Sequence, residues 1–394
     1  MTFRMYFAFD ISSLQWTLLQ LGLLAVVISF VTFMIRVLPL RRHRKSDDEG
    51  DTAGALEDVA VIVYSHDDDS GLATLLPQIF AQDYPGRFEV VVVNEGESAA
   101  VTDVVSTMQL THRNLYLTCT PDGVRNLSRK KLAITLGIKA TRMPVIVLTT
   151  AGSEIDSPLW LRSMTRHFSS DTSTEVVLGF AAAPPYDDRA MGARARSFDF
   201  VADSAAWVSP AIRRHPWRGT EHNLAYRREL FFRNKGFSRH LNLRNGDDDI
   251  FVSEITNGTN TVVELSPESL VYVPGANSPR AFSDEKARRS FTSRFIPHRP
   301  RLLGGVAFTS YFLAPIFALA VGILSPYNTC AWAMSAAVLI LWYLTGLIWT
   351  VAVKVLHGRR LLLTLPFLAF FRPVRKFKRG LRSIFKHGKR YTWE

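Results

Sequence analysis

Long apolar runs near both ends of the chain flank a mixed region. Three runs, at residues 14–40, 302–324 and 329–353, are long enough to cross about 30 Å of hydrocarbon as helices. The polar turn at 325–328 predicts that the last two form a helical hairpin. The first run is too long for a signal peptide and no small-residue cleavage site follows it, so we expect an uncleaved anchor. A shorter apolar run at 361–371 is predicted to lie in the membrane interface.

The middle of the chain alternates short β-branched runs with stretches of helical spacing. Strands are expected at 59–64, 88–93 and 144–148, and helices at 72–82 and 132–140. Short apolar strands that alternate with helices are typical of an α/β domain with a mainly parallel sheet. Ligands of such sheets bind beyond the carboxyl ends of the strands. The polar residues that follow each strand are therefore candidates for a binding site.

These patterns predict five segments along the chain, with the α/β domain placed between membrane helices. The segments are an N-terminal transmembrane anchor at 1–40, a basic and acidic linker at 41–57, the α/β domain at 58–293, two transmembrane helices at 294–356, and an interfacial segment with a basic tail at 357–394.

The positive charge of the chain is concentrated beside the apolar runs. The formal net charge is +12, and residues 372–394 carry nine Lys/Arg and one acid. Four more basic residues, Arg41, Arg42, Arg44 and Lys45, follow the first apolar run, so the remainder is about neutral. Charge in these places suits anionic lipid headgroups and argues against nucleic-acid binding. The positive-inside rule then predicts a multi-pass protein of the cytoplasmic (inner) membrane, with the α/β domain and C-terminus in the cytoplasm.

Two motifs near the first strands carry a family resemblance. Residues 61–68 read Val-Ile-Val-Tyr-Ser-His-Asp-Asp, and Ala-Gln-Asp-Tyr-Pro follows at 81–85. They resemble the first strand, turn and helix of family 2 glycosyltransferases with the GT-A fold, and the resemblance covers roughly residues 59–293. It implies transfer of a sugar from a nucleotide diphospho-sugar with inversion. Asn94 and Glu95 stand where the family has acidic acceptors for the nucleotide base, a role that both can still fill, Glu95 as a charged acceptor.

Two basic positions resemble the parts of the family that bind the donor's diphosphate. Residues 128–138 resemble the Lys-x-x-Ala-Leu-x-x-Gly element, with Lys130 at the lysine position near a helix N-terminus, where phosphates bind. Residues 285–289 stand where membrane-bound members have a Gln-x-x-Arg motif. Arg288 matches the arginine, which can clamp a phosphate, and Glu285 departs from the glutamine. Both segments are equally compatible with solvated basic helix ends.

A longer stretch resembles the acceptor side of the family's site. Residues 218–228 closely match the family's Gly-x-x-x-Asn-Leu-Ala-Tyr-Arg-Arg sequence. The resemblance implies that Asn223, Tyr226 and Arg227 lie on the acceptor side of the site.

Three adjacent acids at 247–249 match the family segment that carries the general base. A carboxylate there takes the proton of the acceptor hydroxyl as that hydroxyl attacks the anomeric carbon. The alignment is ambiguous by one residue, and Asp248 is preferred to Asp247. A surface turn or a metal-binding loop is the alternative interpretation of the three acids.

A departure from the family follows the third predicted strand. Thr150 and Gly152 occupy the two positions of the metal-binding Asp-x-Asp motif, and neither supplies a carboxylate. A divalent ion, Mn²⁺ or Mg²⁺, normally bridges the leaving diphosphate there, so its use by this chain is in question. Glu154 and Asp156 are possible ligands from a shifted loop, although Asp156 or Ser157 is favoured as the N-cap of the helix that follows.

Two other accounts of this departure stay open. Lys130, Lys131 and Arg288 can neutralise a diphosphate without metal, or the domain can be catalytically degenerate. If the domain is active, with either a shifted metal site or cations alone, it is predicted to be a membrane-bound glycosyltransferase. Its partners would be a nucleotide diphospho-sugar, a lipid-linked or cell-surface glycan acceptor and membrane lipids. The degenerate account predicts a glycosyltransferase-like scaffold in a membrane glycan-assembly complex. A transporter is disfavoured because the last two spans contain no ionisable residue.

Overall fold

The backbone contacts divide the chain into two units. The computed structural model describes residues 11–47, 56–66, 68–96, 98–121, 127–183, 192–274, 278–296, 299–324, 326–359 and 361–385. Within these ranges, the α/β unit comprises residues 42–185 and 210–297, and the helical unit comprises residues 1–41, 186–209 and 298–386. The helical unit thus includes a segment from the middle of the sequence. Residues 48–55 of the expected linker and 386–394 of the basic tail lie outside the described ranges.

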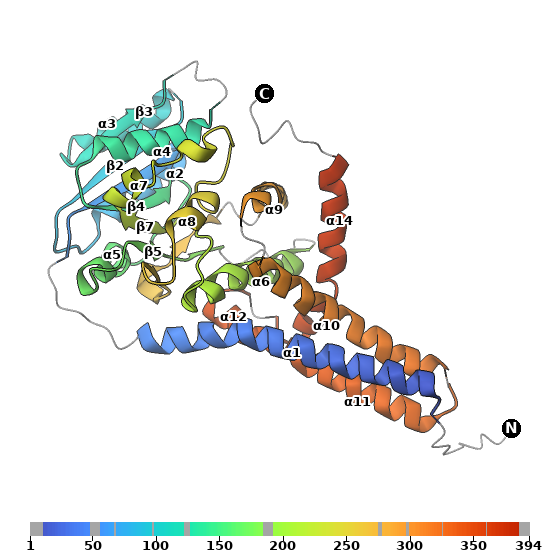
Figure 1. The fold of residues 1–394 in the computed structure, drawn as a ribbon. Helices are drawn as coiled ribbons and strands as arrows, with labels where there is room; N and C mark the ends of the chain where they lie inside the picture. Colours follow the sequence, from blue (N-terminus) through green and yellow to red (C-terminus); the bar gives the residue numbers. More distant parts are fainter. Residues whose placement is uncertain are drawn as a thin grey trace. The chain divides into compact units, whose positions relative to one another are not determined.

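The α/β unit is built on a sheet of seven strands (Figure 1). The strands are β1 (Val59–Ser65), β2 (Phe88–Asn94), β3 (Leu115–Cys119), β4 (Val145–Thr150), β5 (Val176–Leu178), β7 (Leu224–Arg227) and β8 (Thr261–Val263). Their order in the sheet is β3-β2-β1-β4-β7-β5-β8. All neighbours are parallel except β7, which is antiparallel to both β4 and β5. The prediction of an α/β fold with a mainly parallel sheet is confirmed.

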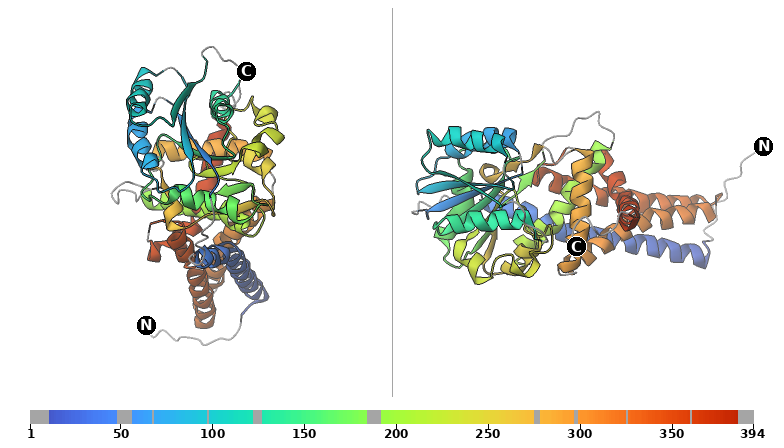
Figure 2. Two further views of the ribbon diagram at one scale, coloured as in Figure 1. Left: turned by 90° about the vertical axis from the view of Figure 1, so that its left-hand side faces the viewer. Right: turned by 90° about the horizontal axis from the view of Figure 1, so that it is seen from above.

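Helices cover both faces of this sheet (Figure 2). They are α2 (Asp69–Phe80), α3 (Ala99–Gln109), α4 (Arg129–Ala140) and α5 (Trp160–Ser170). Val61 and Val63 of β1 pack in one core with apolar side chains of α2, α3 and α5. Ile62, between them in the sequence, lies against α4. Successive side chains of a strand point to opposite faces, so a strand covered on both sides needs the unbroken β-branched run that β1 has.

Gly137 allows α4 to lie close to the sheet. A Cβ atom at this position would lie 2.6 Å from Val93 Cγ2 and 3.0 Å from Ile62 Cγ2. A side chain there would therefore push the helix away from β1 and β2. Because Lys130 lies about two turns before Gly137 on the same helix, this close packing also determines where the first turn of α4 stands.

The parallel register brings the carboxyl ends of three strands to one edge. Ser65 at the end of β1 pairs with Asn94 at the end of β2, and Tyr64 pairs with Thr150 at the end of β4. Residues that follow these strands are thus neighbours in space although they are far apart in the sequence.

Short elements complete the α/β unit. They are β6 (Ala181–Ala182) and β9 (Val271–Tyr272), which form a small parallel sheet, α7 (Arg228–Arg233), η1 (Ser238–His240), α8 (Ile250–Ile255), η2 (Pro267–Ser269), α9 (Pro279–Thr292) and η4 (Ser293–Phe295). The helix expected after β4 begins later than predicted. Its first residue is Trp160 and its N-cap is Leu159, so the prediction that Asp156 or Ser157 caps it is wrong.

Among its described residues, the helical unit contains three helices that are long and apolar enough to cross a membrane. Their apolar parts are Ser13–His43, Leu302–Leu324 and Thr329–Val355. The elements that lie wholly or mostly in this unit are α1 (Ser13–Asp47), α6 (Ala193–Ile212), α10 (Arg299–Leu324), α11 (Thr329–Gly346), α12 (Trp349–Val355), η5 (Leu362–Thr364), α13 (Leu365–Phe370) and α14 (Arg372–Phe385). Helices α10 and α11 pack against each other as the predicted hairpin.

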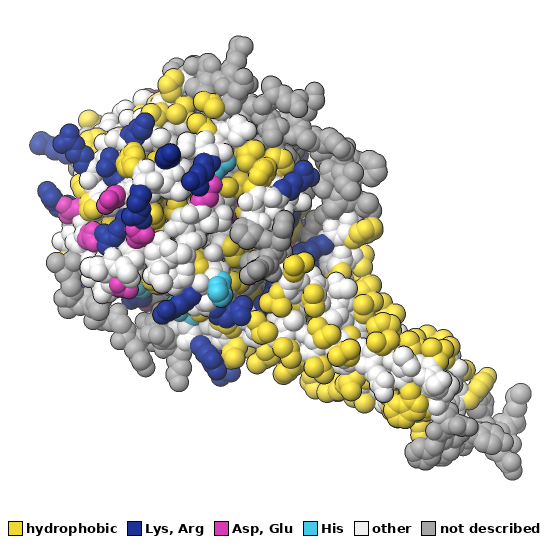
Figure 3. Space-filling view, viewed as in Figure 1, with side chains coloured by type: hydrophobic (Ala, Val, Ile, Leu, Met, Phe, Trp, Pro, Cys, Tyr) yellow, Lys and Arg dark blue, Asp and Glu magenta, His cyan; other side chains and the backbone are white. Residues whose placement is uncertain are grey.

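Large apolar side chains are exposed along these helices. Figure 3 shows them over the visible face of α1, α10 and α11. They include Leu24, Phe30, Ile323, Ile340 and Leu344. Apolar surface of this extent is rare on proteins that are surrounded by water. Some polar groups between the helices are bonded internally: Gln15 Nε2 donates to Val321 O, and Tyr311 OH donates to Trp342 O.

The first turn of the basic helix α14 is bound to acids of α6. Arg372 Nη2 lies 2.5 Å from Asp203 Oδ1, and Arg375 Nη2 lies 3.0 Å from Asp199 Oδ1. The Arg372 guanidinium also lies over the Phe308 ring, 4.1 Å from its centroid. Part of the positive charge of the tail is therefore neutralised within the helical unit itself.

Asn223, at the start of β7, ties three segments of the α/β unit together. Its Nδ2 donates to Phe180 O (3.0 Å) and to Ser269 O (2.8 Å), and its Oδ1 accepts from Trp160 Nε1 (3.1 Å). The side chain is fully buried. A buried amide whose bonds are all made within the protein is costly to remove, because each partner is then left without a hydrogen bond.

We therefore expect Asn223→Ala to lower the free energy of unfolding of the α/β unit by roughly 2–5 kcal/mol. Urea denaturation of the detergent-solubilised protein measures this loss. The control is Asn234→Ala, because Asn234 is half-buried and its bond to Glu254 is long, at 3.4 Å. Equal stability of the two variants would contradict the role given to Asn223.

Candidate functional site

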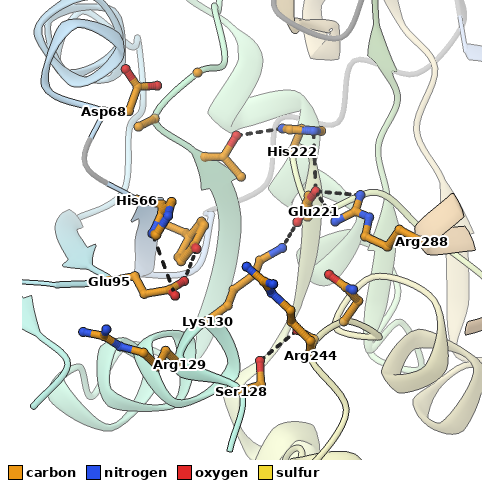
Figure 4. A pocket seen from close by; sticks show the side chains of 15 residues that line it. His66, Asp68, Glu95, Ser128, Arg129, Lys130, Glu221, His222, Arg244 and Arg288 are labelled. Atoms are coloured by element: carbon orange, nitrogen blue, oxygen red, sulfur yellow. Dashed lines mark hydrogen bonds and ion pairs between the residues drawn. The ribbon is translucent and has the colours of Figure 1, made fainter. Parts of the chain in front are cut away.

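A pocket of about 390 Å³ opens at the carboxyl ends of β1, β2 and β4 (Figure 4). This volume is in the range of small-molecule sites. The lining comes from these strand ends, the first turn of α4, the segments that precede β7 and α8, and α9. The lining residues are Tyr64, His66, Asp68, Glu95, Ser128, Arg129, Lys130, Thr150, Ala151, Gly152, Glu221, His222, Arg244, Asn245 and Arg288.

The structure brings together most of the residues expected to bind the donor. Those that line the pocket are Glu95, Lys130, Thr150, Gly152 and Arg288. Asn94 does not line it: its side chain is fully buried, and neither amide atom has a partner among the described residues. Glu95 accepts a hydrogen bond from the Tyr64 hydroxyl. Burial and the charge of Glu95 raise the pKa of Tyr64, so its phenol stays protonated and donates to the carboxylate.

Lys130 and Arg288 meet at one carboxylate, that of Glu221 (Figure 4). Lys130 Nζ forms an ion pair with Glu221 Oε2. Arg288 Nη1 and Nη2 each donate to Glu221 Oε1 at 3.0 Å. The two cations come from α4 and α9, so Glu221, ahead of β7, connects three parts of the α/β unit. Charge-assisted hydrogen bonds of this kind are about twice as strong as neutral ones.

Each of these two cations has a second acidic partner. Lys130 Nζ lies 2.7 Å from Asp247 Oδ2, and Arg288 donates to Glu285. Burial opposes the ionisation of Asp247, but the nearby charges of Lys130 and Arg288 hold its pKa below the usual value. The pKa of Glu285 is likewise lowered, because Arg288 and two further arginines outweigh the effect of burial. Asp247 and Glu285 are therefore both ionised at neutral pH.

His222 occupies the space beside the substituted metal motif. Its Nδ1 lies 2.7 Å from Thr150 Oγ1 and 3.4 Å from Ser153 Oγ, and its Nε2 lies 3.8 Å from Glu221 Oε1. Burial, together with the positive charges of Lys130 and Arg288, lowers the pKa of His222 to about 3. The imidazole is therefore neutral, and Thr150 is held by a hydrogen bond instead of binding a cation.

The residues at this place do not fit the divalent ion that the family resemblance implies. Thr150 and Gly152 carry no carboxylate, and Asp68, whose Oδ2 lies 3.4 Å from where a Gly152 Cβ would stand, caps α2 by accepting from Gly71 N. In the described part of the chain, no three His, Cys, Asp or Glu side chains are grouped as metal ligands. Glu154 and Asp156 are not among the residues that line the pocket.

Lys131, next to Lys130, points away from the pocket into the protein. Its Nζ donates to the carbonyl oxygens of His240 (2.7 Å), Leu243 (3.0 Å) and Asn245 (2.8 Å) and lies 2.8 Å from His240 Nδ1. Burial lowers its pKa to about 8, so the amine is still largely protonated at neutral pH. Lys131 therefore supplies no direct contact for a diphosphate. Instead it fixes the 240–245 loop, which leads to the three adjacent acids.

The three adjacent acids have different surroundings. Asp249 caps α8 by accepting from Ile250 N and also accepts from the Thr292 hydroxyl. Burial and the neighbouring Asp248 raise the pKa of Asp249 to about 6. Asp247 touches the pocket residue Lys130, and Asp248 is buried beside it. Asp249 is thus engaged in local structure, Asp247 stands next to the pocket, and the charge of Asp248 helps to raise the pKa of the pocket residue Arg288.

The residues expected on the acceptor side lie in the sheet, away from the pocket lining. Asn223 bonds the core segments described above, and Tyr226 is fully buried in β7. Arg227 donates to Thr174 O and to Phe168 O and pairs with Glu57. Their side-chain contacts hold the sheet and its surroundings, and their role toward an acceptor stays a prediction.

Two important residues of the pocket, Glu221 and His222, were not identified from the sequence. They precede Asn223 within a stretch that resembles the family's acceptor segment. The signal that could have found them is an acid and a histidine directly before a buried strand, since residues at strand ends often face a site. The partner that each one contacts comes from another part of the chain, so the sequence alone does not reveal it.

No protein-family model matches this chain, and no curated protein sequence matches it. Several solved structures match this chain. The mannosyltransferase PcManGT from Pyrobaculum calidifontis, in complex with GDP-Man and Mn²⁺, matches with a TM-score of 0.55 at 18% identity, over 93% of this chain and 100% of that chain. TarS 1–349 from S. aureus matches with a TM-score of 0.40 at 14% identity, over 82% of this chain and 92% of that one.

A third similar structure is mannosyl-3-phosphoglycerate synthase from Rubrobacter xylanophilus, with a TM-score of 0.41 at 14% identity over 68% of this chain and 78% of that one. At these identities the similarity shows the fold alone. The α/β unit has a GT-A-like fold, and the predicted resemblance to GT-A glycosyltransferases is confirmed at that level. The family number and the roles of single residues stay predictions.

The contact between His240 and Lys131 predicts a pH dependence of stability. Burial and the charge of Lys131 lower the pKa of His240 to about 4, below an unfolded value of about 6.5. A histidine that is held neutral contributes stability above the unfolded pKa, and this is lost as pH falls toward the folded pKa. Below about pH 6 the loss is roughly 1.4 kcal/mol per pH unit.

His240→Gln offers a neutral acceptor to Lys131 and should remove this part of the pH dependence. Thermal unfolding of the solubilised protein between pH 7 and pH 5 measures it, with a shallower decline expected in the variant. The control is His215→Gln, which removes an exposed histidine and should follow the wild-type profile. Identical slopes for wild type and His240→Gln would show that this histidine is not held neutral.

Proposed function

We propose that this chain is a membrane-bound glycosyltransferase that moves a sugar from a nucleotide diphospho-sugar to a hydroxyl of a lipid-linked or cell-surface glycan, with inversion. One observation carries the proposal. A pocket at the carboxyl ends of the parallel strands of a GT-A-like fold is lined by Lys130 and Arg288 and adjoins Asp247. This arrangement offers cations to a diphosphate and a carboxylate to an acceptor hydroxyl within one small site.

The donor is bound by groups from several strand ends and helices. Glu95, at the end of β2, accepts hydrogen bonds from the nucleoside. Lys130 and Arg288 bind the diphosphate, aided by the first turn of α4, whose amide groups favour anions. The side chains beside Thr150 do not suit a divalent ion. Lys130 and Arg288 therefore offset the charge that develops on the leaving diphosphate.

The transfer step needs one base. The carboxylate takes the proton of the acceptor hydroxyl while the hydroxyl oxygen forms a bond to the anomeric carbon. The bond from that carbon to the diphosphate oxygen breaks, and the nucleoside diphosphate leaves with the electron pair. Asp248 is the first candidate for the base and Asp247 the second. Asp247 is the weaker base while its ion pair with Lys130 lasts, because that pair lowers its pKa.

A second candidate function is a scaffold in a membrane glycan-assembly complex. The observation that favours it is the closed charge network, in which Glu221 binds both Lys130 and Arg288. Together with the missing carboxylates at Thr150 and Gly152, this contact leaves fewer groups available to a donor than an active site of this fold needs.

A panel of nucleotide-sugars decides between the two functions. The solubilised protein is mixed with GDP- and UDP-sugars in Mn²⁺ or in EDTA, and release of the nucleoside diphosphate is measured. We expect turnover of at least one donor, with little loss in EDTA because Lys130 and Arg288 carry the diphosphate. A strong requirement for Mn²⁺ that disappears in Glu154→Gln would support the shifted metal site instead. No turnover and no binding of any donor would favour the scaffold.

The base is tested by two neighbouring variants. Asp248→Asn and Asp247→Asn keep the shape of the side chain and remove its basicity, so one of them should lower turnover about 10²- to 10⁴-fold with donor binding little changed. The control is Asp284→Asn, an exposed acid of α9. Wild-type turnover in both of the first two variants would exclude this pair as the base.

The orientation of the spans is part of the same proposal. Since the basic clusters flank one side of each apolar run, the C-terminal tail should lie in the cytoplasm and the α10–α11 turn outside. In a background without Cys119 and Cys330, Tyr327→Cys in that turn should react with an impermeant thiol reagent added to intact cells. Ser383→Cys in α14 should react only after the cells are broken. Strong labelling of Ser383→Cys in intact cells would reverse the orientation.

A further inference from the structure

Glu221 stands between the two cations that a diphosphate would need. Its Oε2 pairs with Lys130 Nζ, and its Oε1 accepts from both Nη atoms of Arg288, so both carboxylate oxygens are in use. The Glu221 side chain is 13% exposed and lines the pocket. An anion bound at once by a lysine and by both terminal nitrogens of an arginine takes the place that a phosphate group could occupy between the same two cations.

The two cations are anchored without Glu221. Lys130 also pairs with Asp247, whose side chain is 3% exposed, and Arg288 also pairs with Glu285 on its own helix. Neither Asp247 nor Glu285 is among the pocket-lining residues. These two acids, which do not line the pocket, therefore hold Lys130 and Arg288 in position, and Glu221 covers the sides of the cations that face the pocket.

The charges of the pocket lining are almost balanced while Glu221 is in place. Four lining residues are cationic and three are acidic: Arg129, Lys130, Arg244 and Arg288 against Asp68, Glu95 and Glu221. Asp68 is used in capping α2, and Glu95 is bonded by Tyr64. Glu221 is thus the acid of the lining that is bonded to the cations at the pocket, and its withdrawal would leave a site that attracts a doubly charged group.

We propose that Glu221 is a built-in anion that occupies the diphosphate position, so that a nucleotide binds by displacing this carboxylate from Lys130 and Arg288. The inference rests on the proposed donor site, and it names the residue that sets how tightly the donor's diphosphate is bound. His222 gives the displaced carboxylate little electrostatic compensation, because its low pKa keeps it neutral. Binding is then an exchange of one anion for another, and its strength depends on how well the diphosphate outcompetes Glu221.

The test is the affinity of the full chain for pyrophosphate, GDP and UDP, measured by calorimetry in detergent with EDTA present. Glu221→Gln removes the competing charge and keeps the size of the side chain. We expect it to bind each of the three probes about 10-fold or more tightly than the wild type, the order of magnitude of one charge-assisted hydrogen bond. Pyrophosphate has no base or sugar, so a gain with this probe assigns the effect to the diphosphate position.

Two further variants control for charge and for folding. Glu229→Gln changes the net charge equally at an exposed position of α7 and should bind like the wild type. Glu221→Asp keeps the charge and should also stay near the wild-type affinity. Thermal unfolding of each variant establishes that it is folded under the conditions of the titration. A Glu221→Gln protein that fails to fold is replaced by Glu221→Ser, for which the same gain is expected.

The outcomes separate this inference from the proposed function. Tighter binding in Glu221→Gln, or binding in that variant alone, supports the displaced anion, even if no sugar is transferred by either protein. Affinities of the folded variant that are equal to or weaker than those of the wild type, or absent in both, overturn it. Transfer by the wild type together with weaker binding in Glu221→Gln would leave the enzyme standing and give Glu221 a role in holding the donor.

Discussion

The buried ammonium of Lys131 is the interaction on which the candidate site depends. A charged group that is removed from water needs hydrogen-bond partners within the protein. For Lys131 these partners are carbonyl groups of the 240–245 loop and the ring of His240. The first turn of α4 is thereby tied to the chain that leads into Asp247 and Asp248. Ser128, the N-cap of α4, strengthens the link by donating to Arg244 O. The two parts of the candidate site that we assign to the donor and to the base are thus held together by one helix end.

The pocket itself is governed by a closed set of charges. Glu221 is shared by Lys130 and Arg288, and each of those cations has a second acidic partner outside the pocket lining. Buried ion pairs add little net stability because both partners lose water. A network of this kind is therefore better explained by a function in binding than by a contribution to the stability of the fold. In the function that we propose, Lys130 and Arg288 offset the charge of the diphosphate, and Glu221 balances these cations when no ligand is bound.

In the helical unit, more than in the α/β unit, large apolar side chains lie on the outside. Many of its outer side chains are apolar, and Gln15 and Tyr311, between its helices, donate to backbone carbonyls. The acids of α6 belong to this unit and bind Arg372 and Arg375 of α14. A segment from the middle of the sequence therefore packs in the unit of the long apolar helices, and its acids are partners for the basic helix α14.

The sequence by itself determined the strands β1, β2 and β4, the helices α2 and α4, and the three apolar spans, because long runs with a clear period depend on local pattern. It also determined that Glu95, Thr150 and Gly152 lie together, since strand ends of a parallel sheet share an edge. Short strands such as β5 and β7 carry too few residues for a period, and only tertiary pairing defines them. The two adjacent lysines of α4, Lys130 and Lys131, show most clearly what the sequence alone does not determine. Successive helix residues are rotated by about 100°, so one lysine faces the pocket and the other the interior. Which one does so was decided only by the packing of α4 against the sheet at Gly137.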